Sequence, residues 1–263
     1  MPHRPALHFG HANGFPAPCY RKLFELLAGE FNIGFLERAG HDPRFPVTDG
    51  WPHLVDEQIA FIETHCREPV LGVGHSLGGY LMLMGAVRRP DLFRAVILLD
   101  APLLPRFTGS ALLFIKRVGL IDRGAPAAAA RSRRREWPSR EDALAHFARK
   151  VLFRSFDAEC LEDYVRFGTM PSAHGVQLRF DARVEYEIYR TLPHNMAAKA
   201  AHLRIPGGFL GGTRSSMLTS GRLAATRRRL QVELIEGGHL FPFQRPEATA
   251  QAIYEMARRL GVR

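Results

Sequence analysis

The residue with the clearest chemical signature is Ser76, in the run Gly-His-Ser-Leu-Gly-Gly at residues 74–79. An apolar run precedes it and an amphipathic pattern with helical spacing follows it. Gly-x-Ser-x-Gly at such a junction is typical of a sharp strand-to-helix turn that exposes a serine hydroxyl. The same short pattern also fits a Gly-rich turn that binds phosphate. A serine hydroxyl becomes a useful nucleophile only when a neighbouring base takes its proton, so the motif requires partner groups elsewhere in the chain.

A candidate base lies near the C-terminus, in Glu-Gly-Gly-His-Leu-Phe-Pro-Phe at residues 236–243. This loop follows the last predicted strand and precedes the last predicted helix. Its glycines allow the chain to bend, so that His239 can reach back over the strand ends toward Ser76. The sequence holds twelve histidines, and most of the others fit ordinary surface or core positions. We therefore predict His239 as the base.

The pattern of the whole chain explains how two distant residues could meet. Apolar runs alternate with amphipathic stretches, which is typical of βαβ units around a parallel sheet. We predict strands over 6–9, 31–36, 70–74, 93–100, 203–212 and 231–235. We predict helices over 18–27, 51–65, 77–88, 219–230 and 245–260. The carboxyl ends of parallel strands meet at one edge of a sheet, and Ser76 and His239 each follow such an end.

The middle of the chain departs from this pattern for about one hundred residues. It contains helical pieces over 139–153, 157–167 and 184–192, but no convincing buried strand. Ser139 and Asp142 have the spacing of a capping box at the start of the first piece. We therefore predict a core built from residues 1–101 and 203–263, with a helical cap inserted over 102–202.

Composition narrows the class of protein. A chain of 263 residues with 46% hydrophobic content suits one α/β domain with an insertion. No apolar run approaches the ~20 residues that span a bilayer, and the first residues lack the apolar core of a signal peptide. These features predict a cytoplasmic protein with no integral membrane segment. The three cysteines are odd in number and far apart, so they suggest neither a disulfide framework nor a metal site.

The formal net charge of +10 comes largely from arginine, concentrated at 131–135 and 227–229. Such runs attract anions in some proteins. Neither run is interleaved with aromatic residues, as a nucleic-acid-binding surface would be. We therefore interpret both runs as solvated surface and predict no nucleic-acid partner.

With these motifs in place, the chain resembles a serine hydrolase of the α/β-hydrolase superfamily with a helical cap, of the esterase and lipase kind. The resemblance rests on His-Ala-Asn-Gly-Phe-Pro at 11–16, the elbow at 74–79 and Gly-Gly-His at 237–239. It implies the α/β-hydrolase fold, with a mostly parallel sheet of about six strands. The first two strands of the family are absent, because the oxyanion turn already falls at 11–16. The resemblance also implies backbone N–H donors for an oxyanion at Leu77 and Phe15, with His11 and Asn13 bracing the turn.

The acid of the expected triad departs from the family pattern. Its usual place is the loop after the penultimate strand, here residues 211–217, which contain neither Asp nor Glu. Asp100 follows the strand over 93–100, and some relatives place their acid after this strand. We therefore predict Asp100 as the acid, with a Ser-His dyad or a carboxylate from the cap as alternatives.

Together these residues predict an enzyme that cleaves a carboxylic ester, or a related acyl bond, of a small and largely apolar substrate through an acyl-enzyme. A serine at position 76 excludes haloalkane dehalogenases and epoxide hydrolases, which need a carboxylate nucleophile there. A non-catalytic ligand-binding protein, a cofactor-free haloperoxidase or perhydrolase, and a C–C bond hydrolase remain as alternatives. We expect no cofactor and no metal, and the expected partner is a small-molecule acyl substrate. The sequence leaves the oligomeric state open.

Overall fold

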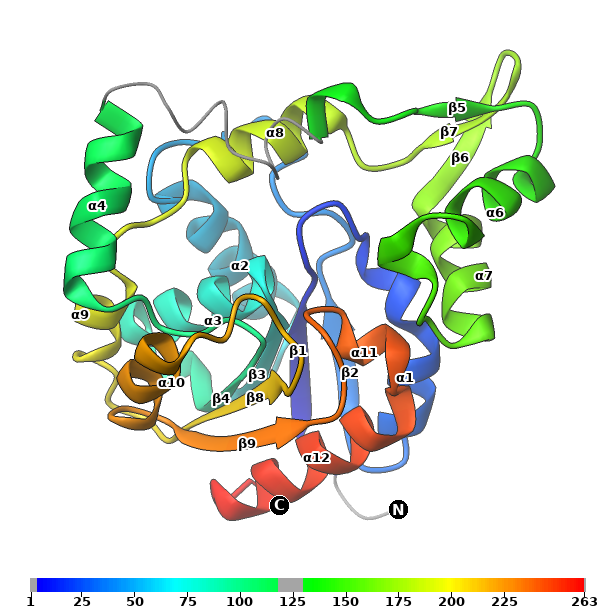
Figure 1. Cartoon of the computed structure of the whole chain (residues 1–263). Helices are drawn as coiled ribbons and strands as arrows, with labels where there is room; N and C mark the ends of the chain where they lie inside the picture. The colour runs from blue at the N-terminus through cyan, green and yellow to red at the C-terminus, as the bar shows by residue number, and fades with distance from the viewer. Residues whose placement is uncertain (1–3, 118–129, 263) are drawn as a thin grey trace.

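The computed structural model describes residues 4–117 and 130–262, and its centre is a parallel sheet of six strands (Figure 1). The strand order is β2-β1-β3-β4-β8-β9, and every neighbouring pair is parallel. The strands are β1 (Ala6–Gly10), β2 (Asn32–Phe35), β3 (Val70–His75), β4 (Phe93–Leu99), β8 (Gly207–Gly212) and β9 (Gln231–Ile235). The predicted fold class is confirmed.

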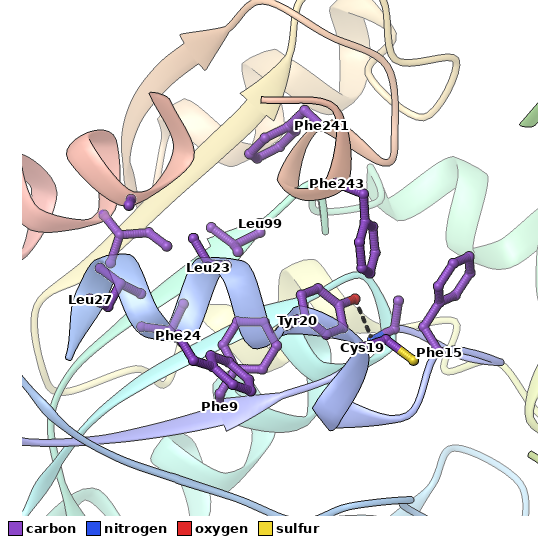
Figure 2. Close-up of a cluster of buried hydrophobic side chains, with 14 of the residues drawn as sticks. Phe9, Phe15, Cys19, Tyr20, Leu23, Phe24, Leu27, Leu99, Phe241 and Phe243 are labelled. Atoms are coloured by element: carbon purple, nitrogen blue, oxygen red, sulfur yellow. Dashed lines mark hydrogen bonds between the residues drawn. The ribbon is translucent and has the colours of Figure 1, made fainter. Parts of the chain in front are cut away.

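Helices cover both faces of this sheet. The residues of β4 alternate between two buried clusters: Ile97 packs with α1 (Arg21–Leu27) and α12 (Pro246–Arg259), whereas Leu98 packs with α2 (Pro52–His65) and α3 (Leu77–Arg88). A strand covered on both faces must be apolar on both, which explains the continuous apolar run that predicted it. Figure 2 shows the first of these clusters, where the ring of Tyr20, just before α1, lies beside that of Phe243, which follows β9.

The remaining core elements follow the sequence prediction with small shifts. The predicted helix over 18–27 is a short 3-10 turn, η1 (Ala17–Tyr20), followed by α1. The others are η2 (Pro90–Leu92), α10 (Ser220–Arg227) and α11 (Phe241–Gln244). The strand predicted from residue 203 starts only at Gly207. Pro206 lies just before that start and lacks an N–H to donate to the ladder, although its carbonyl accepts from the Val96 N–H at 3.1 Å.

Residues 102–202, which we call the cap segment, hold several short elements between β4 and β8. They are α4 (Arg106–Arg117), β5 (Glu136–Trp137), α6 (Arg140–Ala148), η4 (Val151–Phe153), α7 (Ala158–Gly168), β6 (Thr169–Ser172), β7 (Gly175–Leu178), α8 (Ala182–Arg190) and α9 (Met196–Ala200). In Figure 1 α8 and the short strands lie at the top of the molecule, opposite the two termini. The division of the chain into core and cap domains stays a prediction.

Two expectations for the cap segment were wrong. It contains a three-stranded antiparallel sheet of order β5-β7-β6, which the sequence did not reveal because the strands are only 2–4 residues long. The helix predicted over 139–153 ends at Ala148 and is followed by the separate turn η4. Its start is as predicted, since the Ser139 hydroxyl accepts from the Asp142 N–H at 3.0 Å.

Two further observations concern the described residues as a whole. Within 4–117 and 130–262, every helix is too short or too polar to cross a membrane. All three cysteines are free thiols, with Cys19 and Cys160 buried and Cys66 partly buried.

Candidate active site

Ser76 lies on a strained turn between β3 and α3. Its backbone has φ +52° and ψ −111°, a region that side chains disfavour and that often marks a functional site. Across the described residues, only Trp51, Ser76 and Asp100 combine a side chain with a positive φ. Two of these three are residues that the sequence predicted as catalytic.

The glycines around Ser76 permit this turn by letting backbones touch. A Cβ atom on Gly74 would lie 2.3 Å from the carbonyl of Gly78, and one on Gly78 would lie 2.0 Å from the carbonyl oxygen of Gly10. Neither contact leaves space for a side chain. The first turn of α3 is thus packed against the ends of β3 and β1, and Ser76 stays partly accessible among buried neighbours.

Asp100 and His239 form a direct pair. His239 Nδ1 lies 2.7 Å from Asp100 Oδ2, and Asp100 is fully buried while the His239 side chain is 29% exposed. Because a carboxylate only accepts, Nδ1 carries the proton and Nε2 of the neutral ring is left as an acceptor. Two residues 139 positions apart are therefore brought together as predicted, although their catalytic roles are not tested by this contact.

The loop after β8, which has no carboxylate of its own, contributes donors to Asp100. The Gly212 N–H donates to Oδ1 at 3.0 Å, and the buried Ser215 hydroxyl donates to Oδ2. With His239, the carboxylate accepts three hydrogen bonds, which offset the cost of burying its charge. The role of Ser215 was not predicted from the sequence, where its only signal is a small hydroxyl residue in a loop that holds the acid in most of the family.

His75, the residue before Ser76, links the elbow to the loop of His239. It is fully buried, and burial lowers its pKa to about 3, so the ring is neutral. Nε2 donates to the His239 carbonyl at 2.8 Å. Nδ1 therefore accepts from the Tyr20 hydroxyl at 2.7 Å, and that oxygen in turn accepts from the Ala12 N–H at 3.2 Å.

These contacts form one buried chain of hydrogen bonds, which we call the Tyr20–His75 relay. It joins the turn after β1, the elbow after β3 and the loop after β9. Tyr20 is enclosed by aromatic rings, with the Phe243 ring centroid 4.4 Å away and that of Phe9 4.7 Å away (Figure 2). Such packing fixes the hydroxyl, and through it the relative positions of the three loops.

The turn after β1 carries the predicted oxyanion donor at Phe15. It is held to α3 by a hydrogen bond of 3.1 Å from the Gly78 N–H to the His11 carbonyl. His11 and Asn13 brace it as expected: His11 Nε2 accepts from the Ala39 N–H at 2.8 Å, and Asn13 Nδ2 donates to the Glu185 carbonyl at 3.0 Å. However, the Phe15 N–H donates to the Ala12 carbonyl at 3.1 Å within the turn, so an oxyanion would have to compete for it.

Leu77, the other predicted donor, is the first residue of α3. An N–H at this position has no carbonyl one helical turn earlier to donate to, and the positive end of the helix dipole lies there. This N–H suits an anion.

The nucleophile and base positions are neighbours without a formed hydrogen bond between them. The rings of His75 and His239 have centroids 5.2 Å apart, so the His239 loop lies against the residue that precedes Ser76. Among the hydrogen bonds of the described residues, none joins Ser76 to His239. Catalytic hydrogen bonds are often long in the absence of substrate and shorten when it binds.

The described residues offer no candidate for a resident metal. Over 4–117 and 130–262, no group of three or more His, Cys, Asp or Glu side chains gathers closely enough to hold an ion.

Comparison with known proteins agrees with this geometry. Residues 9–252 match the model of the alpha/beta hydrolase family. The chain belongs to this family. It is 29% identical over 112 residues to the abhydrolase domain-containing protein AFT2-1 of Alternaria alternata, a match that covers 43% of this chain and only 38% of that relative.

Two solved structures show the shared fold over nearly the whole chain. One is E-2-(acetamidomethylene)succinate hydrolase, with a TM-score of 0.82, 20% identity and coverage of 97% of this chain and 92% of the other. The second is the esterase Rv0045c of M. tuberculosis, with a TM-score of 0.68, 21% identity and coverage of 97% and 86%. At such identities the likeness shows the fold alone.

Proposed function

We propose that this protein is a serine hydrolase that cleaves a carboxylic ester, or a related acyl bond, through an acyl-enzyme. The observation that carries the proposal is the contact of 2.7 Å between the buried Asp100 and His239. The Tyr20–His75 relay joins the loop of His239 to the Ser76 turn. A partly accessible serine, a carboxylate and an imidazole in this order along the chain are the parts of a nucleophilic triad.

The chemistry follows from the tautomer of His239. Because Nδ1–H donates to Asp100, Nε2 can take the proton of Ser76 as the hydroxyl attacks the substrate carbonyl. The same nitrogen then returns this proton to the leaving group, which departs and leaves an acyl-Ser76 ester. Water, activated in the same way, hydrolyses that ester. Throughout, Asp100 orients the ring and stabilises its transient positive charge.

The negative charge on the carbonyl oxygen needs donors in the transition state. We assign Leu77 N–H as one donor. We assign the Phe15 N–H as the second donor. When substrate binds, this N–H would break its hydrogen bond to the Ala12 carbonyl and donate to the oxyanion instead. The cap segment, residues 102–202 of our domain division, would shape the substrate site. Relatives of this fold include proteins named as an esterase and as a hydrolase, which supports the reaction class.

A non-catalytic ligand-binding protein is the second candidate. Two observations favour it: no Ser76–His239 hydrogen bond forms among the described residues, and the Phe15 N–H is already engaged at 3.1 Å. Haloperoxidase, perhydrolase and C–C bond hydrolase activities would use the same three residues, and no contact in the site favours them over ester hydrolysis.

Turnover of p-nitrophenyl acetate and butyrate, together with labelling by a fluorophosphonate, separates the two candidates. We expect turnover and labelling of the native chain, and loss of both in Ser76→Ala. Ser216→Ala is the matched control, because Ser216 is an exposed serine on a different loop, and it should behave as the native chain. Labelling that survives in Ser76→Ala would refute the assignment, and a folded native chain with neither turnover nor labelling would favour the binding protein.

A further inference from the structure

A cavity over the oxyanion turn bears on the substrate that the proposed function leaves open. Its volume is about 620 Å³, and its lining includes Asn13 and Phe15 from the turn after β1. The other lining residues belong to the cap segment, among them Arg133, Lys150, Tyr164 and Glu185. The turn that holds Asn13 and Phe15 is bonded to α3 through His11 and Gly78, whereas Ser76 and His239 are not among the residues that line the cavity.

One side of this cavity is aromatic. The Phe15 ring lies 5.0 Å from that of Tyr164 and 6.3 Å from that of Phe153, measured between centroids. Tyr164 is 1% and Phe153 6% exposed, so both also belong to the packed interior of the cap segment. This side suits the hydrocarbon part of a small substrate.

Other residues that line the cavity are cationic. Arg133, Arg134 and Lys150 line the cavity, and Glu185 is its single carboxylate. Arg133 Nη2 lies 2.5 Å from Glu185 Oε2, and the Arg133 side chain is 24% exposed. The other titratable groups add no charge near neutral pH. Burial raises the pKa of Tyr189 to about 12, and burial together with Lys150 lowers the pKa of His146. The walls therefore carry an excess of positive charge.

The same place gathers polar atoms that lack a well-formed hydrogen bond. Within the part of the chain that the structure describes, nine buried side-chain atoms have no hydrogen-bond partner. Two of them lie here outside any ion pair, Asn13 Oδ1 and Arg133 Nε. Two others, Arg133 Nη2 and Glu185 Oε2, face each other in the ion pair described above. Asn13 and Glu185 are each only 6% exposed. A carboxylate has no hydrogen to donate to Asn13 Oδ1, so the atom that it can serve is Arg133 Nε, whose N–H lacks the partner that buried polar groups nearly always have.

We propose that this cavity binds a free carboxylate on the substrate, so that the preferred substrates are esters or related acyl compounds that carry a second, ionised carboxyl group. A planar guanidinium recognises a carboxylate by paired, charge-assisted hydrogen bonds. The aromatic side then contacts the short hydrocarbon part between the carboxylate and the scissile bond. The proposal rests on the proposed hydrolase function and adds to it a substrate class.

The test compares two pairs of esters that differ by one carboxylate. Mono-p-nitrophenyl glutarate against p-nitrophenyl butyrate places the charge on the acyl side, and 4-carboxyphenyl butyrate against phenyl butyrate places it on the leaving group. In at least one pair, we expect kcat/KM to be about tenfold or more higher for the charged ester, after correction for the rate with hydroxide.

Variants locate the source of that preference. Arg133→Gln alone would leave the buried Glu185 carboxylate without its partner, so the double variant Arg133→Gln/Glu185→Gln is used to keep the pair neutral. Lys150→Gln removes a charge at the cavity without breaking this pair. We expect the charged-to-neutral ratio of kcat/KM to fall by about tenfold in the double variant and by less in Lys150→Gln. Arg227→Gln, at an exposed arginine outside the cavity, should keep the native ratio.

The outcomes separate this inference from the function on which it rests. If no ester is hydrolysed, the proposed hydrolase function fails. If neutral and charged esters are hydrolysed equally, or if Arg227→Gln lowers the ratio as much as the double variant, the hydrolase stands and the carboxylate site is refuted. Inorganic phosphate that inhibits hydrolysis of the charged ester as strongly as glutarate does would show a general anion site and overturn the assignment to a carboxylate.

Discussion

Replacing Asp100 by asparagine is the most informative single change, because it keeps the shape of the side chain and alters only its hydrogen bonding. In the native chain Oδ1 accepts from the Gly212 N–H at 3.0 Å, and Oδ2 accepts from His239 Nδ1 at 2.7 Å and from Ser215. An amide has one oxygen and one NH2 group, so one of these two sites must receive a donor.

The Gly212 N–H decides which of the two oxygen sites receives the NH2 group of the asparagine. A backbone N–H cannot accept, so the amide oxygen of the variant stays at the Oδ1 site and its NH2 group faces His239 and Ser215. Ser215 can turn its hydroxyl to accept instead of donate. His239 Nδ1 must also accept, which moves the ring proton to Nε2. That nitrogen then points a proton toward Ser76 and cannot act as a base.

The expected loss is therefore that of a wrong histidine tautomer, about 10⁴ in kcat, which corresponds to about 5 kcal/mol of transition-state stabilisation. Initial rates with p-nitrophenyl butyrate over a range of concentrations measure kcat and KM separately. We expect KM to change little, because Asp100 is fully buried and has no access to substrate.

Thermal unfolding of the variant serves as the control that it is folded. A folded Asp100→Asn protein whose kcat falls by less than tenfold would refute the reasoning, and the acid would have to be sought among the carboxylates of the cap segment.

Two further changes probe groups around this site, and a third probes a buried carboxyl group elsewhere in the core. Ser215→Ala removes one of the three donors to the buried carboxylate and should lower the free energy of unfolding by about 1–3 kcal/mol in urea titrations; no loss of stability would mean that the Ser215 hydroxyl does not support Asp100. Tyr20→Phe leaves both the Ala12 N–H and His75 Nδ1 without partners, so we expect about 2–4 kcal/mol of destabilisation and a lower kcat at nearly constant KM. An unchanged kcat in a folded Tyr20→Phe protein would show that the relay does not position the base. Glu57 lies outside the site, and burial raises the pKa of its carboxyl group to about 7. The stability that this group contributes is therefore complete below its ordinary pKa and is lost as pH rises through 7. Glu57→Gln keeps an oxygen for the Gly40 N–H. Its free energy of unfolding should exceed that of the native chain by up to about 3 kcal/mol at pH 8.5 and equal it at pH 4. Equal free energies of unfolding at both pH values would contradict this expectation.

The sequence predicted the parts of the fold that depend on local pattern. The runs that became β3 and β4 are buried over nearly their whole length, and burial on both faces leaves a continuous apolar signature. The turn at Ser76 could also be predicted, because the backbone contacts at its glycines are too short for any side chain and therefore require glycine in the sequence. His239 could be predicted because it follows a strand whose end must lie at the same edge of the sheet.

Features that depend on contacts between residues distant in sequence could not be predicted. β5 pairs Glu136 with Gln177 and Trp137 with Val176, and two residues are too few to show an alternating pattern. Ser215 acquires its importance only because β4 and β8 are neighbours in the sheet. For Phe15, alignment with the family's motif identified the turn, but it could not show that this N–H already has a partner within it.

The position of Asp100, the proposed acid, follows from the same sheet geometry. β4 and β8 pair in parallel with Leu99 opposite Leu210, and the Asp100 N–H continues the ladder by donating to the Leu210 carbonyl at 2.8 Å. Neighbouring strands are about 4.8 Å apart, so a carboxylate after β4 and one after β8 can reach the same histidine from adjacent strand ends. The strained backbone of Asp100, with φ +45°, turns its side chain toward the loop after β8, where Gly212 and Ser215 supply the donors. A triad can therefore be complete without a carboxylate in that loop, because Gly212 and Ser215 of the loop donate hydrogen bonds to a carboxylate that follows the neighbouring strand β4.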